Sequence, residues 1–249
     1  MAATWYFLIA MMLGTYAVLD GFDFGVGIHF VVAKTDAERR EVLAAIGPVW
    51  DGNEVWLIAS GGVMVFAFPR VYSAGFSGLY LPLMMVLWLL ILRGIAIEFR
   101  SKVENPLWRH GFDFTFSFAS TIMAVVLGVA LGNIVRGVPL DASGWFQEDL
   151  FTNFSPTANG EARLGALDVY TGLMGIFALA TLAAHGATYL VWKTSGDVHD
   201  RSALAARRLW PVVLALGAVL TVATARCVRR SSHASRSTRT TPRRHEPRS

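Results

Sequence analysis

The sequence predicts an all-α fold, a polytopic membrane bundle of about six transmembrane helices. Hydrophobic residues make up 54% of the 249-residue chain and charged residues only 16%, whereas a soluble domain carries about a quarter charged residues. Apolar segments recur that approach or exceed the length of about 20 residues that a spanning helix needs. Basic residues gather in every second connection between these segments. Together these observations favour a chain that crosses a membrane repeatedly.

The apolar segments lie near residues 5–32, 48–68, 74–97, 113–135, 167–192 and 209–225. The second is short in apolar terms, but it becomes long enough when it is extended back to Pro48, a residue suited to a first helical turn. The sixth is also short, and Arg226 ends it. No basic residue precedes the first segment, so we expect it to remain as a transmembrane helix rather than to be cleaved as a signal peptide.

The connections between the segments orient the chain. Basic residues are concentrated in the first, third and fifth connections: Lys34, Arg39, Arg40, Arg100, Lys102, Arg109, Lys193, Arg201, Arg207 and Arg208. The second connection has only Arg70. Basic loops tend to stay in the cytoplasm, so the odd connections are predicted to be cytoplasmic and the N-terminus outside.

The chain divides by composition into two parts, residues 1–225 and 226–249. The first holds 14 basic and 17 acidic residues, and we expect it to form the transmembrane domain. The second holds eight arginines and one acidic residue, with almost no apolar side chains. It cannot bury a core, so it is predicted to be a basic disordered tail. Six crossings would place this tail outside, against the tendency that orients the other loops.

Two acidic residues interrupt the first segment, Asp20 and Asp23. An unpaired carboxylate in hydrocarbon costs roughly 2.5–3.5 kcal/mol on insertion scales, so such groups mark cavities, ion pairs or proton paths. Their spacing of three places them on one helix face. The alternative is a helix end that reaches the lipid headgroups, where His29 would cap the interface.

The second segment opens with Trp50, Asp51, Asn53 and Glu54, followed by Trp56. Acids in a first turn offset the helix dipole, and tryptophan is common at membrane interfaces, so these residues have a purely structural explanation. The dense combination of carboxylates, amide and indoles equally suits the handling of protons or a ligand.

The third segment ends with Arg93, Glu98 and Arg100. A buried guanidinium requires a carboxylate partner, so we expect Arg93 to meet the acids of the first two segments. Glu98 could instead simply pair with Lys102 along the helix. At the start of the fourth segment, Asp113 fits a role at the helix dipole.

The sequence offers little for metals, haem or nucleic acid. Cys227 is the sole cysteine, which excludes an internal disulfide and a cysteine metal cluster. Axial haem ligation by His185 would need a second histidine or methionine on a facing helix, and neither His29 nor the eight methionines show a pattern that designates one. No phosphate-binding glycine loop, hydrolase triad or nucleic-acid motif is recognisable, so no nucleic-acid partner is expected.

Six motifs carry a resemblance to a known family. They are LDGFDFGVG at 19–27, GPVWDGNEVWLI at 47–58, FPRVYSAGFSGLYLPL at 68–83, RGIAIEFRSK at 93–102, GNIVRGVP at 132–139 and HGATYL at 185–190. In this order and spacing they resemble subunit II of cytochrome bd-type quinol oxidases. The resemblance covers residues 5–225.

The resemblance implies a role inside a complex of the bacterial cytoplasmic (inner) membrane. Such complexes oxidise membrane quinol, reduce dioxygen to water and take the protons from the cytoplasm, which generates proton-motive force. Haem b and haem d are bound by subunit I, with which subunit II forms a heterodimer, and a small accessory single-helix subunit can join them. Subunit II itself carries no haem ligand, no metal and no catalytic residue, and it is not active alone.

The resemblance also assigns residues. In some members a proton path begins at the pair matching Trp50 and Asp51 and passes the acid matching Glu98. The polar interior beside it would contain the residues that match Asp20, Asp23, Asn53, Glu54, Arg93 and Arg100. Family members have about eight helices, so the chain is expected to be truncated or frameshifted near Arg226, with a genuine tail as the alternative.

Two other functions remain open on the sequence. The polar residues could serve packing alone in a purely structural membrane partner. A proton-coupled transporter would also place acids and an arginine inside the membrane, but it should show repeated broken segments in its two halves. No second copy of either acidic motif is visible in the sequence.

Overall fold

The computed structural model describes residues 1–138, 140, 143–146 and 165–240, with side chains up to residue 225. All regular structure in these residues is helical, which confirms the predicted fold class. The helices are α1 (Ala2–Phe30), α2 (Asp36–Ile46), α3 (Trp50–Ala67), α4 (Pro69–Gly78), α5 (Tyr80–Phe99), α6 (Pro106–Arg136), α7 (Val169–Lys193) and α8 (Gly196–Thr240).

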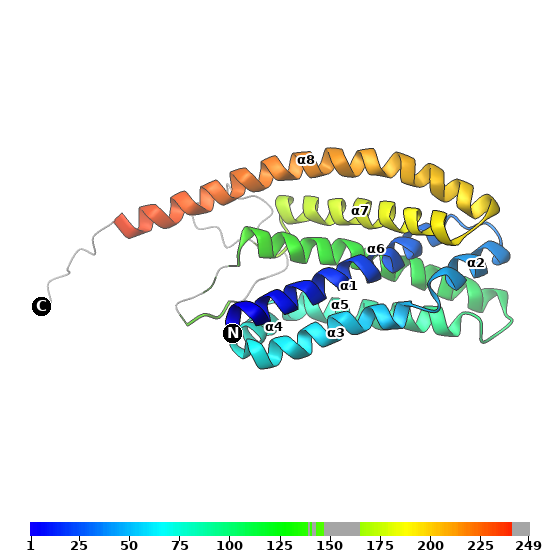
Figure 1. The fold of residues 1–249 in the computed structure, drawn as a ribbon, viewed down its shortest axis with the longest axis horizontal. Helices are drawn as coiled ribbons and strands as arrows, with labels where there is room; N and C mark the ends of the chain where they lie inside the picture. The colour runs from blue at the N-terminus through cyan, green and yellow to red at the C-terminus, as the bar shows by residue number, and fades with distance from the viewer. Residues whose placement is uncertain (139, 141–142, 147–164, 241–249) are drawn as a thin grey trace, which may run out of the picture.

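The long helices run side by side along the longest axis of the molecule (Figure 1). α1 lies in the middle of the bundle and contacts α3, α6 and α7. α5 packs on α6, and α8 packs on α7. The short helix α2 lies at one end of the bundle, between α1 and α3 in the chain. The central position of α1 brings its polar residues next to several other helices.

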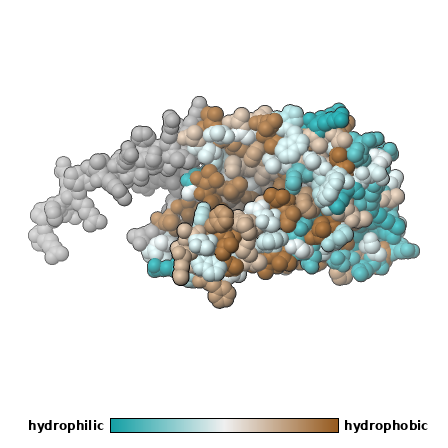
Figure 2. All heavy atoms as spheres, in the orientation of Figure 1, coloured by the Kyte–Doolittle hydropathy of each residue, from teal (hydrophilic) through white to brown (hydrophobic). Residues whose placement is uncertain are grey.

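The connections after α1, α5 and α7 lie at the same end of the bundle as α2 (Figure 1). We call this the basic end, because the basic residues of the first, third and fifth connections belong to it. Hydrophilic residues gather there on the surface, whereas hydrophobic residues dominate the middle of the bundle (Figure 2). This is the distribution expected of a protein whose middle lies in lipid.

Within the described part of the chain, five helices are long and apolar enough to cross a membrane: α1, α5, α6, α7 and the Gly196–Ala225 part of α8. The 18-residue α3 is not among them, since Asp51, Asn53 and Glu54 in its first turns reduce its hydropathy. It nevertheless packs along α1. The predicted total of six crossings therefore depends on α3, the second predicted segment. Whether α3 crosses the membrane stays a prediction.

The third predicted segment is divided in the structure. α4 ends at Gly78 and α5 begins at Tyr80, with Leu79 between them in a non-helical conformation. Pro82 explains the break, because its ring would clash with the carbonyl group four residues earlier in a continuous helix.

The sixth predicted segment begins earlier than expected and continues beyond Arg226. α8 starts at Gly196 and runs to Thr240, so residues 201–208, predicted as part of a connection, are helical. Residues 241–249 of the predicted tail lie outside the described residues. The division into a membrane domain and a disordered tail stays a prediction.

The helix α2 was not predicted, although its start carries a sequence signal. Thr35 caps the helix by accepting a hydrogen bond from the backbone N–H of Glu38 at 3.2 Å. A threonine followed three residues later by glutamate is typical of a helix start.

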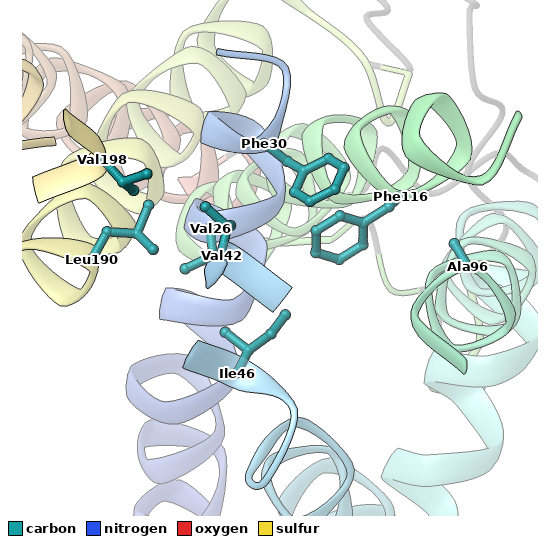
Figure 3. Close-up of a cluster of buried hydrophobic side chains, with 8 residues drawn as sticks. All are labelled: Val26, Phe30, Val42, Ile46, Ala96, Phe116, Leu190 and Val198. Atoms are coloured by element: carbon teal, nitrogen blue, oxygen red, sulfur yellow. The ribbon is translucent and has the colours of Figure 1, made fainter. Parts of the chain in front are cut away.

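A cluster of buried apolar side chains holds α2 against the bundle (Figure 3). In it Val42 and Ile46 of α2 lie with Val26 and Phe30 of α1, and the Phe30 ring meets Phe116 of α6 edge to face.

Glycines allow α1 and α7 to cross in close contact. A Cβ atom at Gly25 would lie 2.1 Å from the carbonyl oxygen of Leu182, and one at Gly186 would lie 2.2 Å from the backbone of Gly25. No side chain fits between these backbones, which is how small residues permit close helix packing in membranes.

We expect Gly25→Ala to destabilise the bundle by about 1–3 kcal/mol, because the added methyl group forces α1 and α7 apart. Thermal unfolding of the detergent-solubilised chain measures the effect. The matched control is Gly14→Ala on the same helix, where a Cβ meets nothing within 4 Å. Equal melting temperatures for the two variants would contradict the close crossing.

Candidate functional site

A buried arginine lies at the centre of the candidate site. Arg93 of α5 is 0% exposed. Its Nη1 donates to Asp20 Oδ1 of α1 at 2.6 Å, and its Nη2 donates to Glu54 Oε1 of α3. The guanidinium also lies over the Phe24 ring, 4.4 Å from its centroid. One side chain therefore joins three helices, and it meets acids of the first two segments as expected from the sequence.

A second contact joins α1 and α3 beside this ion pair. The side-chain amide of Asn53 donates to Asp23 Oδ2 at 2.8 Å and lies 3.4 Å from the carbonyl oxygen of Leu19. Asp20 and Asp23 are both 0% exposed. We call Asp20, Asp23, Asn53, Glu54 and Arg93 the buried polar cluster. It contains three carboxylates and one guanidinium.

Several polar atoms in and beside the cluster have no hydrogen-bond partner among the described residues. They are Tyr16 Oη, Asp20 Oδ2, Asp23 Oδ1 and Arg93 Nε. Tyr16 lies one helical turn before Asp20 on α1, and it is also buried. A buried polar atom normally finds a partner, so the cluster retains unused capacity to donate and accept hydrogen bonds.

The three residues of the predicted proton path lie outside this cluster. Trp50, at the start of α3, packs toward α5, where a Cβ at Gly94 would lie 3.5 Å from its ring. Asp51 and Glu98 are exposed. Neither carboxylate makes a hydrogen bond or ion pair to the described residues, so the alternative pairing of Glu98 with Lys102 is not formed. α5 ends at Phe99, so Lys102 is not on the same helix as Glu98 and cannot pair with it at helical spacing.

Arg100 belongs to a different group of charges at the basic end. It is 2% exposed, and its guanidinium donates to Asp113 of α6 and to Asp36 Oδ1 of α2, the latter at 2.9 Å. Arg39 of α2 also donates to Asp113 Oδ2, at 2.7 Å. Arg100 is thus buried and polar, but it lies apart from the buried polar cluster.

Sequence reasoning missed the roles of Asp36 and Asp113. The expected dipole role of Asp113 is wrong, because α6 begins seven residues earlier at Pro106 and Asp113 instead pairs with arginines. Contacts from Arg100 and Arg40 hold the pKa of Asp36 below its ordinary value, so this carboxylate is charged at neutral pH. The recognisable signal was Thr35, which caps the N-terminus of α2, so that Asp36 is the first residue of this helix.

Another buried ion pair lies at the opposite end of the bundle. Arg136, at the end of α6, donates to Asp168, the N-cap residue of α7. Asn133 donates to the carbonyl oxygen of Ala166 at 2.7 Å. These contacts fix the start of α7 against the end of α6.

The intramembrane histidines are engaged by backbone carbonyl groups. His29 Nε2 donates to Ala183 O at 2.8 Å, and His185 Nε2 donates to Val18 O at 3.0 Å. Each ring thereby links α1 to α7. Among the described residues, no group of three or more His, Cys, Asp or Glu side chains is placed to hold a metal ion.

Fold and site together define a polytopic helical membrane protein with an ion-paired polar interior. A family model described as cytochrome bd terminal oxidase subunit II matches residues 1–234. The chain belongs to this family, as the six motifs predicted.

Named relatives extend the comparison. The chain is similar to cytochrome bd-I ubiquinol oxidase subunit 2 of Escherichia coli, with 36% identity over 199 residues, 80% of this chain and 50% of the relative. It is also similar to cytochrome bd ubiquinol oxidase subunit 2 of Bacillus subtilis, with 35% identity over 210 residues, 84% of this chain and 58% of the relative. The chain therefore spans about half the length of these relatives.

A solved structure shares the fold. A chain of the bd oxidase from Geobacillus thermodenitrificans superposes with a TM-score of 0.69 at 17% identity, over 91% of this chain and 66% of that chain. At this identity the likeness supports the arrangement of the helices and nothing finer.

We expect Arg93→Gln to destabilise the chain by about 3–5 kcal/mol, because it leaves Asp20 and Glu54 buried without their cation. Arg70→Gln is the matched control, since Arg70 is exposed at the other end of the bundle. The measurement is the melting temperature of each solubilised variant. If Arg93→Gln and Arg70→Gln have the same melting temperature, the ion pair does not hold the three helices together.

Proposed function

We propose that the chain acts as the non-haem membrane subunit of a bd-type quinol:oxygen oxidoreductase and supplies protons to its oxygen-reducing site. Family membership supports the first part, and the relatives named above are ubiquinol oxidase subunits. In this proposal the chain is not active alone. Its partners are a haem-bearing subunit I, membrane lipid and quinone, with an accessory single-helix subunit as a further candidate.

The observation that carries the proton proposal is the position of Glu54. Its side chain is 19% exposed, yet it bonds the Arg93 side chain, which is buried. Asp51 lies three residues earlier on the same helix face and is exposed at the surface. A carboxylate at the surface, one at the boundary and two in the interior thus follow one another from Asp51 through Glu54 to Asp20 and Asp23.

The buried polar cluster has the chemistry of a proton relay. Its three carboxylates outnumber its one guanidinium, so a proton added to the cluster reduces an excess of negative charge. The unpartnered oxygens of Asp20, Asp23 and Tyr16 can exchange protons with water. Arg93 stays charged and holds two of the acids in place.

Trp50 and Glu98 fit the mouth of the same route. Gly94, which faces the Trp50 ring, is one helical turn before Glu98 on α5. Glu98 is therefore close to the start of α3, where Asp51 is exposed. The two exposed acids would collect protons, while the Trp50 ring narrows the space between α3 and α5.

The basic end sets the direction of uptake in this proposal. Basic loops tend to face the cytoplasm, which would place the N-terminus outside the bacterial inner membrane. Trp50, Asp51 and Glu98 then lie near the cytoplasmic side, because α3 begins and α5 ends at the basic end. Protons would enter from the cytoplasm, as an oxidase that builds proton-motive force requires.

The haems belong to the partner in this proposal. The Nε2 atoms of His29 and His185 are engaged by backbone carbonyl groups, so neither ring is set up as an axial ligand. Haem b and haem d, bound in subunit I, would supply electron transfer from quinol and the reduction of dioxygen. This chain would contribute structure and protons.

A purely structural partner is the second candidate, and the buried ion pairs favour it. Arg93 binds three helices together, and a buried pair of this kind can exist for packing alone. The exposed Asp51 and Glu98 distinguish the two functions, since neither pairs with a described residue in the bundle.

We expect Asp51→Asn and Glu98→Gln, each in the assembled oxidase, to slow steady-state oxygen consumption about tenfold or more while haem content stays normal. The control is Glu104→Gln, an exposed acid of the connection after α5. Oxygen electrode traces and haem spectra provide the two readouts. Normal oxygen consumption in both variants would refute the proton route, and lost haem would indicate the structural function instead.

A further inference from the structure

A group of charged side chains at the basic end has more cations than anions. Its members come from α2, from the end of α5 and from the start of α6: Arg39, Arg40, Arg100, Arg109, Asp36 and Asp113. We call this group the arginine cluster. Four guanidinium groups share two carboxylates, so the cluster carries a net charge of about +2 when all are ionised.

The two carboxylates are already fully engaged. Asp36 accepts from Arg40 at 2.6 Å, from Arg100 at 2.9 Å and from Arg109 at 3.2 Å. Asp113 accepts from Arg100 and from Arg39. The nearby Glu38 does not balance the excess charge, because it pairs with Arg201 of α8 at 2.5 Å.

Buried donors in the cluster still lack an acceptor. Arg100 Nη1 and Arg109 Nε have no hydrogen-bond partner among the described residues. Arg100 is 2% exposed, so its free donor is held inside the group. Arg39 also lies 3.4 Å from His110 Nδ1, which adds a further titratable group beside Arg39. Excess positive charge together with free buried donors indicates a missing anion.

The local helix end strengthens the need for an anion. The cluster includes the start of α6, where the helix dipole is positive and the first turn contains no acid. Arg109 adds a cation there. Anions bind readily at such a helix start when cationic side chains converge on it.

The surroundings suit a lipid. Apolar side chains adjoin the cluster on the surface: Phe99, Val103, Leu107 and Trp108. Trp108 donates from its indole to the carbonyl oxygen of Phe99 at 2.8 Å, so both sit beside Arg100 and Arg109. Tryptophan is enriched in the headgroup region of membranes, so Trp108 suits such a position. Acyl chains can cover the apolar residues while a headgroup reaches the arginines.

We infer that the arginine cluster binds a phosphoryl group, carried by an anionic phospholipid whose headgroup lies at the basic end of the bundle. Basic pockets between transmembrane helices are suited to such headgroups, and arginine recognises phosphate oxygens with paired donors. This inference does not depend on the proposed proton route, since the cluster is separate from the Asp51 to Glu54 series.

The test uses the full chain, purified and offered equal amounts of phosphatidylglycerol and phosphatidylcholine with identical acyl chains. Native mass spectrometry counts the retained lipids. We expect a preference for phosphatidylglycerol that falls about fivefold in Arg109→Gln, the value for one arginine at a charged membrane surface. Arg207→Gln, an exposed arginine of α8 outside the cluster, is the control and should keep the preference.

A second variant separates binding from folding. Asp36→Asn breaks three ion pairs but removes a negative charge, so we expect it to raise the preference for phosphatidylglycerol about fivefold. A further experiment titrates the full chain with inorganic phosphate. If phosphate binds saturably, Arg109→Gln abolishes this binding and the chain shows no lipid preference, the phosphoryl site is retained and its ligand is a soluble phosphate. Equal retention of both lipids with no phosphate binding, or equal loss in Arg109→Gln and Arg207→Gln, would overturn the inference.

Discussion

The guanidinium of Arg93 is the constraint on which the arrangement of α1, α3 and α5 depends. A buried cation in a membrane protein must find carboxylates, and the only way to bring both Asp20 and Glu54 to Arg93 is to hold these three helices at fixed depth and rotation. The close crossing at Gly25 and Gly186 then fixes α1 against α7. Polar contacts therefore position one side of α1 while backbone contact positions the other.

The same constraint gives the proposed function its physical basis. Because Arg93 draws Glu54 toward the interior, a residue near the surface of α3 becomes a neighbour of the fully buried Asp20. A bundle stabilised by apolar packing alone would offer no such connection. The arginine cluster uses similar side chains differently, since its charges exceed what its own carboxylates can neutralise. One group of charges is directed inward, and the other is directed to the membrane surface.

Much of this could be predicted from the sequence. The membrane class, most of the helices, the family and the meeting of Arg93 with acids of two other helices all follow from hydropathy, loop charge and the cost of buried charge. The break at Leu79 could have been inferred from Pro82, and α2 from the Thr35 cap. The pairing of Arg100 with Asp36 and Asp113 could not, because it depends on how α2 folds back on the ends of α5 and α6. Which polar residues would be buried was equally hidden, since Asp51 and Asn53 lie only two residues apart and Asp51 is exposed while Asn53 is buried.

The central claim is that Glu54 carries protons between the surface and the buried carboxylates Asp20 and Asp23. The most direct measurement is the rate of proton uptake by the assembled oxidase, followed with a pH indicator dye after the quinol-reduced complex is mixed with oxygen. In Glu54→Gln the amide can still accept a hydrogen bond from Arg93, but it cannot carry a proton. The account predicts much slower proton uptake with unchanged electron transfer from quinol to the haems. Proton uptake at the wild-type rate in Glu54→Gln would contradict it.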